Sequence, residues 1–181
     1  MVPAIMALLL LVTTMVVASM ALVKEREEGT MEQLLVTPLR PAELIAGKLL
    51  PFVIIGFVEI FFALGAVFAV FQLAPRGSLL TLLVMSGLFI MTTLGLGLFV
   101  STLVKTQQQA MLVSAFFIMM PFVMLSGFAF PVENMPRVIQ RATDLIPLKY
   151  YITIVRAIYL KGAGWPELWP HAAMLLGWGA A

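Results

Sequence analysis

The feature that most constrains this chain is a series of long apolar stretches separated by polar connectors. Four such stretches cover residues 2–23, 49–71, 79–104 and 110–128. A helix rising about 1.5 Å per residue needs roughly 20 residues to cross a hydrocarbon layer about 30 Å thick. The fourth stretch is continuously apolar only over 110–125, so we expect it to extend past Leu125 to reach this length. The pattern predicts a multi-span membrane protein.

Helices fit these stretches better than strands do. The stretches are too long for single barrel strands, and apolar and polar residues do not alternate strictly along them. Backbone N–H and C=O groups inside lipid must be hydrogen-bonded within the segment, as a helix allows. The predicted fold class is an all-α membrane protein, a multi-span helical bundle. Gly95 and Gly97 in the third stretch are typical of close helix packing in membranes.

Composition supports this class and excludes others. Hydrophobic residues make up 62% of the chain and charged residues 11%, against roughly half and a quarter in soluble domains. The net charge is only +2, and the basic residues are scattered among the connectors, which argues against binding of nucleic acid. The chain has no cysteine and a single histidine, His171, so we expect neither a metal site nor a cofactor in this chain.

The two ends predict that this sequence is part of a longer one. No Lys or Arg precedes Lys24, and the first apolar stretch is longer than that of a signal peptide, so we interpret it as a membrane span. A fifth apolar stretch begins near His171 and stops at Ala181, which predicts an incomplete span over 171–181.

The first polar connector, residues 24–48, contains the most specific pattern. Thr30 and Gln33 have the spacing of a capping box, and Met31, Leu34 and Leu35 would share one apolar side of the helix that follows. Pro41 suits the first turn of another helix that continues into the second span. These features predict a short amphipathic helix between two spans, although a solvated loop with a locally capped helix explains them equally well.

The residues of this connector add a family resemblance. The run Arg26-Glu-Glu-Gly-Thr-Met-Glu-Gln-Leu-Leu-Val-Thr-Pro38 and the following Pro-Ala-Glu-Leu-Ile-Ala-Gly-Lys48 resemble the cytoplasmic loop of type-2 ATP-binding-cassette (ABC) exporter permeases. In that family the loop forms a coupling helix that sits in a cleft of the ATPase subunit. The resemblance therefore implies that ATPase coupling depends on Arg26, Glu27, Glu28, Gly29, Thr30, Glu32 and Gln33.

The long connector over 129–170 predicts two amphipathic helices. Apolar residues recur at helical spacing over 138–146 and again over 151–158, and Gly162 is a suitable stop for the second helix. Both stretches are too polar to span, so we interpret them as interfacial helices, lying flat or dipping partway into the bilayer. The segments Gly127-Phe-Ala-Phe-Pro131 and Pro147-Leu-Lys-Tyr-Tyr151 also resemble the ABC permeases, in which this connector faces outward. The resemblance covers nearly the whole chain.

Charge counting does not orient the chain. The first and third connectors must share one side of the membrane, and they carry five basic residues, Lys24, Arg26, Arg40, Lys48 and Lys105. The second and fourth carry six, Arg76, Arg137, Arg141, Lys149, Arg156 and Lys161. The positive-inside rule requires an excess on one side. Only the resemblance places the first connector in the cytoplasm and the chain in the inner membrane.

Glu59 lies near the middle of the second apolar stretch. An ionised side chain there costs roughly 3 kcal/mol on insertion scales, and none of the four stretches contains a Lys or Arg to pair with it. The carboxyl is then protonated, hydrogen-bonded to a Ser or Thr of a neighbouring span, or exposed to a wet cavity. Glu59 is a candidate contact for substrate or gating, and the simpler alternative is a structural carboxyl.

The resemblance implies the permease subunit of an ATP-driven exporter for a hydrophobic or amphiphilic substrate. The sequence has no Gly-x-x-x-x-Gly-Lys-Ser/Thr loop, so ATP and Mg²⁺ would bind a separate ATPase chain. The other expected partners are a second permease, identical or a sister chain, and membrane lipid. One alternative is an ion-coupled secondary transporter, for which Glu59 is the single candidate group. An intramembrane enzyme is disfavoured because no nucleophile–base spacing is recognisable.

Overall fold

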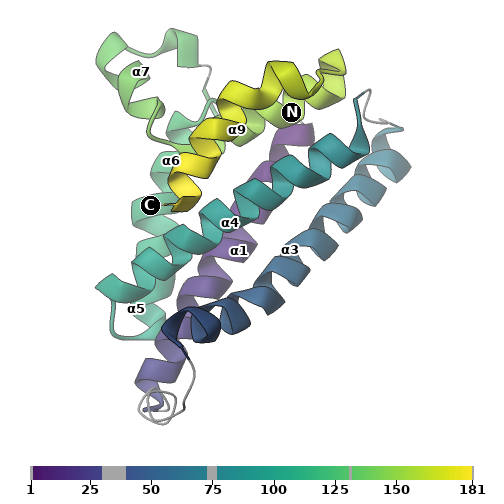
Figure 1. Ribbon diagram of the computed structural model, residues 1–181. Helices are drawn as coiled ribbons and strands as arrows, with labels where there is room; N and C mark the ends of the chain where they lie inside the picture. The colour runs from purple at the N-terminus through teal and green to yellow at the C-terminus, as the bar shows by residue number, and fades with distance from the viewer. Residues whose placement is uncertain (1, 30–39, 73–76, 131, 181) are drawn as a thin grey trace.

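Figure 1 shows the computed structural model as a bundle of helices running between two ends. The structure describes residues 2–29, 40–72, 77–130 and 132–180. The long helices are α1 (Val2–Glu27), α3 (Pro41–Phe71) and α4 (Leu79–Leu103). A fourth continuous helix comprises α5 (Gln107–Leu112), the π-helical segment η1 (Val113–Met119) and α6 (Met120–Leu125). The remaining elements are η2 (Val132–Asn134), α7 (Arg137–Thr143), α8 (Pro147–Arg156), η3 (Ala157–Lys161) and α9 (Trp165–Ala180).

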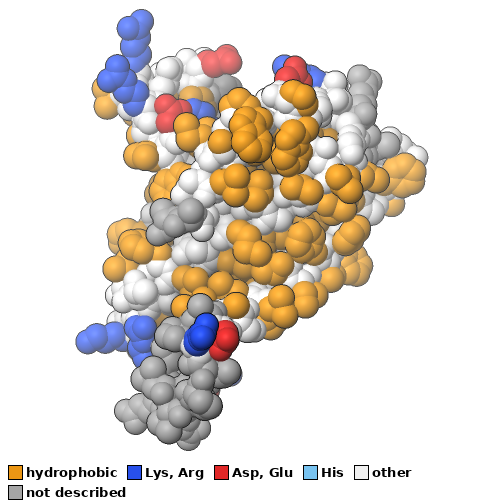
Figure 2. Space-filling view, viewed as in Figure 1, with side chains coloured by type: hydrophobic (Ala, Val, Ile, Leu, Met, Phe, Trp, Pro, Cys, Tyr) orange, Lys and Arg blue, Asp and Glu red, His pale blue; other side chains and the backbone are white. Residues whose placement is uncertain are grey.

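Four of these helices are long and apolar enough to cross a membrane. They cover Ala4–Glu27, Ile45–Val70, Leu79–Leu103 and Gln107–Leu125. Every regular element in the described ranges is helical, so the predicted all-α membrane bundle is confirmed. In Figure 2 the charged side chains gather at the two ends of the visible face, and apolar side chains cover the region between them. This distribution fits a molecule whose middle lies in lipid.

The helices that correspond to the fourth predicted span and to the incomplete fifth span have other limits than the sequence predicts. The fourth gains its length at its start, Gln107, and ends at Leu125, so residues 126–128 are not part of it. Gly127 follows with a φ of +83°, a left-handed conformation that favours glycine and ends the helix. The fifth helix begins at Trp165, ahead of the predicted His171, because Pro166 and Pro170 are both accommodated in α9.

The core is centred on α1, which packs on α3, α4, α5 and α8. α1 approaches α4 closely at Gly97. A Cβ atom at Gly97 would lie 2.8 Å from the carbonyl oxygen of Met15 and 3.0 Å from the Cβ of Ala18. Because glycine has no side chain, the two backbones come close enough here for van der Waals contact. Gly95, by contrast, has no atom within 4 Å of the equivalent position, so close packing is confirmed for one of the two glycines only.

α8 lies inside the bundle and α7 outside it. The predicted apolar side of α8, including Tyr151 and Ile154, is buried and packs against α1, α4 and α9, and Ile158 of the following η3 is buried as well. The Tyr151 ring stacks on Phe89 with centroids 4.1 Å apart, and its hydroxyl lies 2.7 Å from Ser86 Oγ. The sequence predicts an interfacial helix here, with its apolar side toward lipid. In the structure this side contacts other helices instead. α7 projects away from the bundle at the same end (Figure 1).

Candidate functional site

Three consecutive residues at the end of α1 contact three different spans. Glu25 accepts a hydrogen bond from Lys48 Nζ of α3. Arg26 Nη1 donates to the carbonyl oxygen of Ser101 in α4 at 3.3 Å. Glu27 Oε2 accepts from the side-chain Nε2 of Gln107 at 3.0 Å and from its backbone N–H at 3.2 Å. Successive residues of a helix point about 100° apart, so three in a row can reach neighbours on three sides. Together these residues form what we call the α1 junction: Glu25, Arg26, Glu27, Lys48, Ser101 and Gln107.

The contacts of Arg26 and Glu27 match the polarity of the helix ends that they reach. The Ser101 carbonyl is among the last four of α4, which have no partner within their own helix, and a guanidinium is favourable there. The Gln107 N–H is the first of α5 and equally lacks an intrahelical partner, so the Glu27 carboxylate satisfies it. The polar ends of two spans are thus completed by residues of a third.

The start of α5 is closed by a second set of bonds. Thr106 Oγ1 accepts from Gln109 N–H at 3.3 Å, and the Gln109 side chain accepts from Lys105 N–H at 3.1 Å. Thr106 is thus the N-cap residue of α5, which explains why the fourth span starts at Gln107. Glu27 therefore contacts a helix end that is already well defined.

The residues beyond the junction are only partly described. Glu28 makes an ion pair with Lys24 at 3.7 Å, and both side chains are more than half exposed, so the pair adds little stability. Gly29 adopts a φ of +72° directly after α1, which gives it a structural role in ending the helix. Thr30, Glu32 and Gln33, together with the predicted coupling helix, lie outside the described residues.

Glu59 is hydrogen-bonded to a neighbouring span, one of the three situations expected from the sequence. Thr13 Oγ1 of α1 donates to Glu59 Oε2 of α3. The Thr13 hydroxyl also lies 3.0 Å from the carbonyl oxygen of Leu9. Both side chains are partly exposed, so the pair sits at the edge of the α1–α3 contact and remains accessible from outside this chain.

Other hydroxyl pairs connect α1 to the bundle in the same way. Thr14 Oγ1 lies 2.7 Å from Thr93 Oγ1, and Ser19 Oγ lies 3.2 Å from Ser114 Oγ in the π-helical segment. Sequence reasoning did not identify these residues, nor Lys48, Ser101 and Gln107, as site residues. For Gln107 a signal was available, because Thr106 and Gln109 have capping-box spacing. For the hydroxyl pairs there was none.

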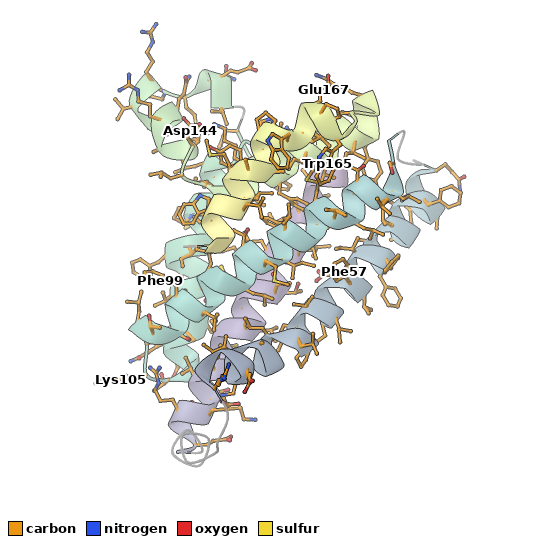
Figure 3. All side chains as sticks on the ribbon, viewed as in Figure 1. Phe57, Phe99, Lys105, Asp144, Trp165 and Glu167 are labelled. Atoms are coloured by element: carbon orange, nitrogen blue, oxygen red, sulfur yellow. The ribbon has the colours of Figure 1, made fainter. Side chains whose placement is uncertain are left out.

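The connectors meet at the ends that the alternation of spans requires. The bonds of Glu27 bring the first and third connectors together. At the opposite end, the Gly77 N–H donates to the Ile158 carbonyl oxygen at 3.1 Å and joins the second connector to the fourth. Figure 3 shows Lys105 at the first end and Asp144 and Glu167 at the other. Within the described ranges, no three His, Asp or Glu side chains gather in a way that would suit a metal ion.

Comparison with known proteins identifies the family. The whole chain, residues 1–181, matches the family described as ABC-2 family transporter protein. It is 36% identical over 173 residues to a probable multidrug ABC transporter permease, YbhR, of Escherichia coli, covering 93% of this chain and 47% of that protein. It is 34% identical over 161 residues to the probable multidrug ABC transporter permease YbhS of the same organism, covering 89% and 43%.

A more distant relative comes from another bacterium. The chain is 25% identical over 174 residues to the linearmycin resistance permease protein LnrN of Bacillus subtilis, covering 96% of this chain and 45% of that protein. The chain thus spans about half the length of the curated relatives it matches. No solved structure matches it. On the family match, the relatives and the four apolar helices, the chain belongs to the ABC-2 family of transporter membrane proteins and is a multi-pass protein of the inner membrane.

Proposed function

We propose that this chain is the permease subunit of an ATP-driven exporter, in which a separate ABC ATPase hydrolyses ATP-Mg and moves the first connector. The α1 junction carries this proposal. Three adjacent residues at the root of the first connector are bonded to α3, α4 and α5, so a displacement of the connector reaches three spans directly. A loop that only joined two spans would not need these bonds.

The fourth span is the part most able to respond. It buries the smallest share of its residues among the four spans. It also contains the π-helical segment Val113–Met119, a feature that often marks functional sites in helices. A displacement of Glu27 that is transmitted to Gln107 would therefore move a span that packs loosely against the rest of the bundle. We propose that this movement changes which side of the membrane the transport pathway faces.

A second permease completes the pathway. The exposed faces of α3 and of the fourth span carry large apolar side chains, among them Phe61, Phe62, Phe116 and Phe117. These faces can meet lipid or another permease, identical or a sister chain. The names of the relatives refer to multidrug transport and linearmycin resistance, which supports export of a hydrophobic or amphiphilic compound.

Glu59 is the candidate contact for substrate or gating within the membrane. Its bond to Thr13 joins α1 to α3, and its partial exposure leaves it accessible to a molecule beside these helices. Export by a Glu59→Gln variant should fall if a charge or a proton at this position is needed. Unchanged export would assign Glu59 a structural role.

Co-purification of the ATPase tests the main proposal. The natural gene product is expressed together with a candidate Walker-type ATPase, for example one encoded in a neighbouring reading frame, and purified through the permease. We expect the ATPase to be retained, and to be lost when Gly29 or Glu32 is substituted. Glu167→Gln, at the opposite end of the bundle, is the control and should retain it. If the unsubstituted permease retained no ATPase, the proposal would fail.

The alternative, an ion-coupled secondary transporter, rests on Glu59 alone. It predicts that transport into vesicles follows an imposed proton gradient without ATP and is abolished by Glu59→Gln. Strict dependence on hydrolysable ATP would exclude this alternative.

A further inference from the structure

α7 has two chemically different sides, and neither is covered by the described part of the chain. On one side, Val138 is 81% exposed and Ile139 is 38% exposed. Leu145, two residues after the end of α7, is 67% exposed. On the other side Arg137 and Arg141, one helical turn apart, are both exposed. Exposed apolar side chains opposite cationic ones are typical of a helix that lies at a membrane surface.

The apolar side is continuous with a membrane span. A groove of about 330 Å³ is lined by Met124, Leu125, Phe130, Asn134, Met135, Pro136 and Ile139. Met124 and Leu125 are the last residues of α6, the end of the fourth span. Because the groove starts where a span leaves the hydrocarbon, it lies at the depth where acyl chains meet headgroups.

The polar side forms a second pocket, also about 330 Å³, lined by Val132, Arg137, Gln140, Arg141, Asp144 and Lys149. Lys149 Nζ lies 2.6 Å from Asp144 Oδ1 and 2.8 Å from Thr143 Oγ1, so the one carboxylate in the pocket already has a cation. The ion pairs among the described residues are Lys24–Glu28, Lys48–Glu25 and Lys149–Asp144, and neither arginine takes part in one. Two guanidinium groups therefore give the pocket its net positive charge.

We propose that α7 binds an anionic phospholipid of the surrounding bilayer, with the phosphate at Arg137 and Arg141 and an acyl chain in the groove beside Ile139. Arginine forms charge-assisted, often bidentate, hydrogen bonds to phosphate. Both pockets are lined by residues of α7, so an amphiphile that wraps around this short helix would use both, whereas a soluble anion would leave the groove empty. The site is at the end of the bundle opposite the α1 junction, and its recognition of lipid does not depend on the proposed ATPase.

Lipid retention tests the headgroup half of the site. The natural gene product is purified from mixed phosphatidylglycerol and phosphatidylcholine, and bound lipid is measured by native mass spectrometry. We expect a preference for phosphatidylglycerol that falls about 25-fold in the Arg137→Gln/Arg141→Gln variant, roughly fivefold for each cation. The control, Arg40→Gln/Lys105→Gln, removes the same charge from exposed residues at the other end and should keep the preference.

The depth of α7 tests the acyl-chain half. Since the chain has no cysteine, single spin labels can be attached at Val138→Cys and at Arg141→Cys in bilayers. We expect the label at 138 to collide with oxygen dissolved in the hydrocarbon and the label at 141 to collide with a water-soluble nickel chelate.

Three outcomes would overturn the inference. The first is equal retention of both lipids by the unsubstituted protein. The second is a label at 138 that is open to the nickel chelate, or shielded from both reagents by a bound protein. The third is displacement of phosphatidylglycerol by an equal concentration of inorganic phosphate, which would identify a soluble anion as the ligand. A folded control variant keeps each result interpretable even if the double variant is destabilised.

Discussion

Gly97 and Gly95 lie on the same helix, two residues apart, and meet different surroundings. A Cβ at Gly97 would clash with the carbonyl oxygen of Met15, a backbone atom that cannot rotate away, whereas a Cβ at Gly95 would meet nothing within 4 Å. The contact between α1 and α4, the most extensive between the described helices, therefore depends on one glycine and not on the other.

Substitution of these glycines should separate packing from helix propensity. Gly97→Val forces α1 and α4 apart, and we expect a destabilisation of about 1–3 kcal/mol, as for other overpacked cores. The control Gly95→Ala should be neutral or slightly stabilising because alanine is the better helix former. Thermal denaturation of the detergent-purified protein, followed by loss of the monodisperse peak in size-exclusion chromatography, measures both. Equal losses at the two positions would contradict the assigned contact.

Single residues show what sequence alone could predict at this scale. The cost of an unpaired carboxyl in lipid predicts a Ser or Thr hydroxyl as one possible partner of Glu59, and the structure identifies it as Thr13. The choice of Thr13 required knowing how α1 and α3 face each other, since 46 residues separate the pair. The distinction between Gly95 and Gly97 is of the same kind, because it depends on which side of α4 meets α1.

At the scale of elements, apolar length predicts the existence of the spans well and their limits less well. The fourth span begins at Gln107 because Thr106 and Gln109 cap it, a local pattern that the search for apolar stretches overlooks. The helical periodicity of α8 correctly marks one apolar side. Periodicity cannot distinguish protein from lipid as the neighbour, however, so the burial of Tyr151 emerges only from the packed bundle.

The junction between α1 and α5 yields a prediction about coupling. Glu27→Ala removes the carboxylate that holds the Gln107 N–H and side chain, so movement of the first connector should no longer reach the fourth span. We expect transport to fall roughly tenfold, within the 1–3 kcal/mol typical of coupling between sites, while the ATPase subunit still co-purifies. Transport and ATP hydrolysis are measured together in reconstituted vesicles.

The matched control is Lys24→Gln, which breaks the exposed Lys24–Glu28 pair within α1 and leaves the contacts between spans intact. It should transport normally. A loss of ATPase binding in Glu27→Ala would indicate that Glu27 contacts the ATPase itself, and identical behaviour of the two variants would remove the special role of the junction.

At the scale of the whole molecule, the structure assigns each connector to one end of the bundle. It does not by itself show which end faces the cytoplasm. The bonds of Glu27 to Gln107 and of Gly77 to Ile158 assign the connectors to two ends. Five basic residues against six leave no charge bias between those ends. The proposed coupling to an ATPase requires the end with the α1 junction to face the cytoplasm, so orientation and function can be tested together.

Single cysteines in this cysteine-free chain provide that test. Glu28→Cys and Gln108→Cys lie at the junction end, and Asn134→Cys and Glu167→Cys lie at the other, all at exposed positions. In intact cells an impermeant thiol reagent should label only the second pair, and permeabilisation should expose the first. Because the fold places each pair at one end, its two members must agree whatever the orientation is. Disagreement within a pair would therefore contradict the fold, whereas agreement with the reverse pattern would contradict the cytoplasmic junction and, with it, the proposed ATPase coupling.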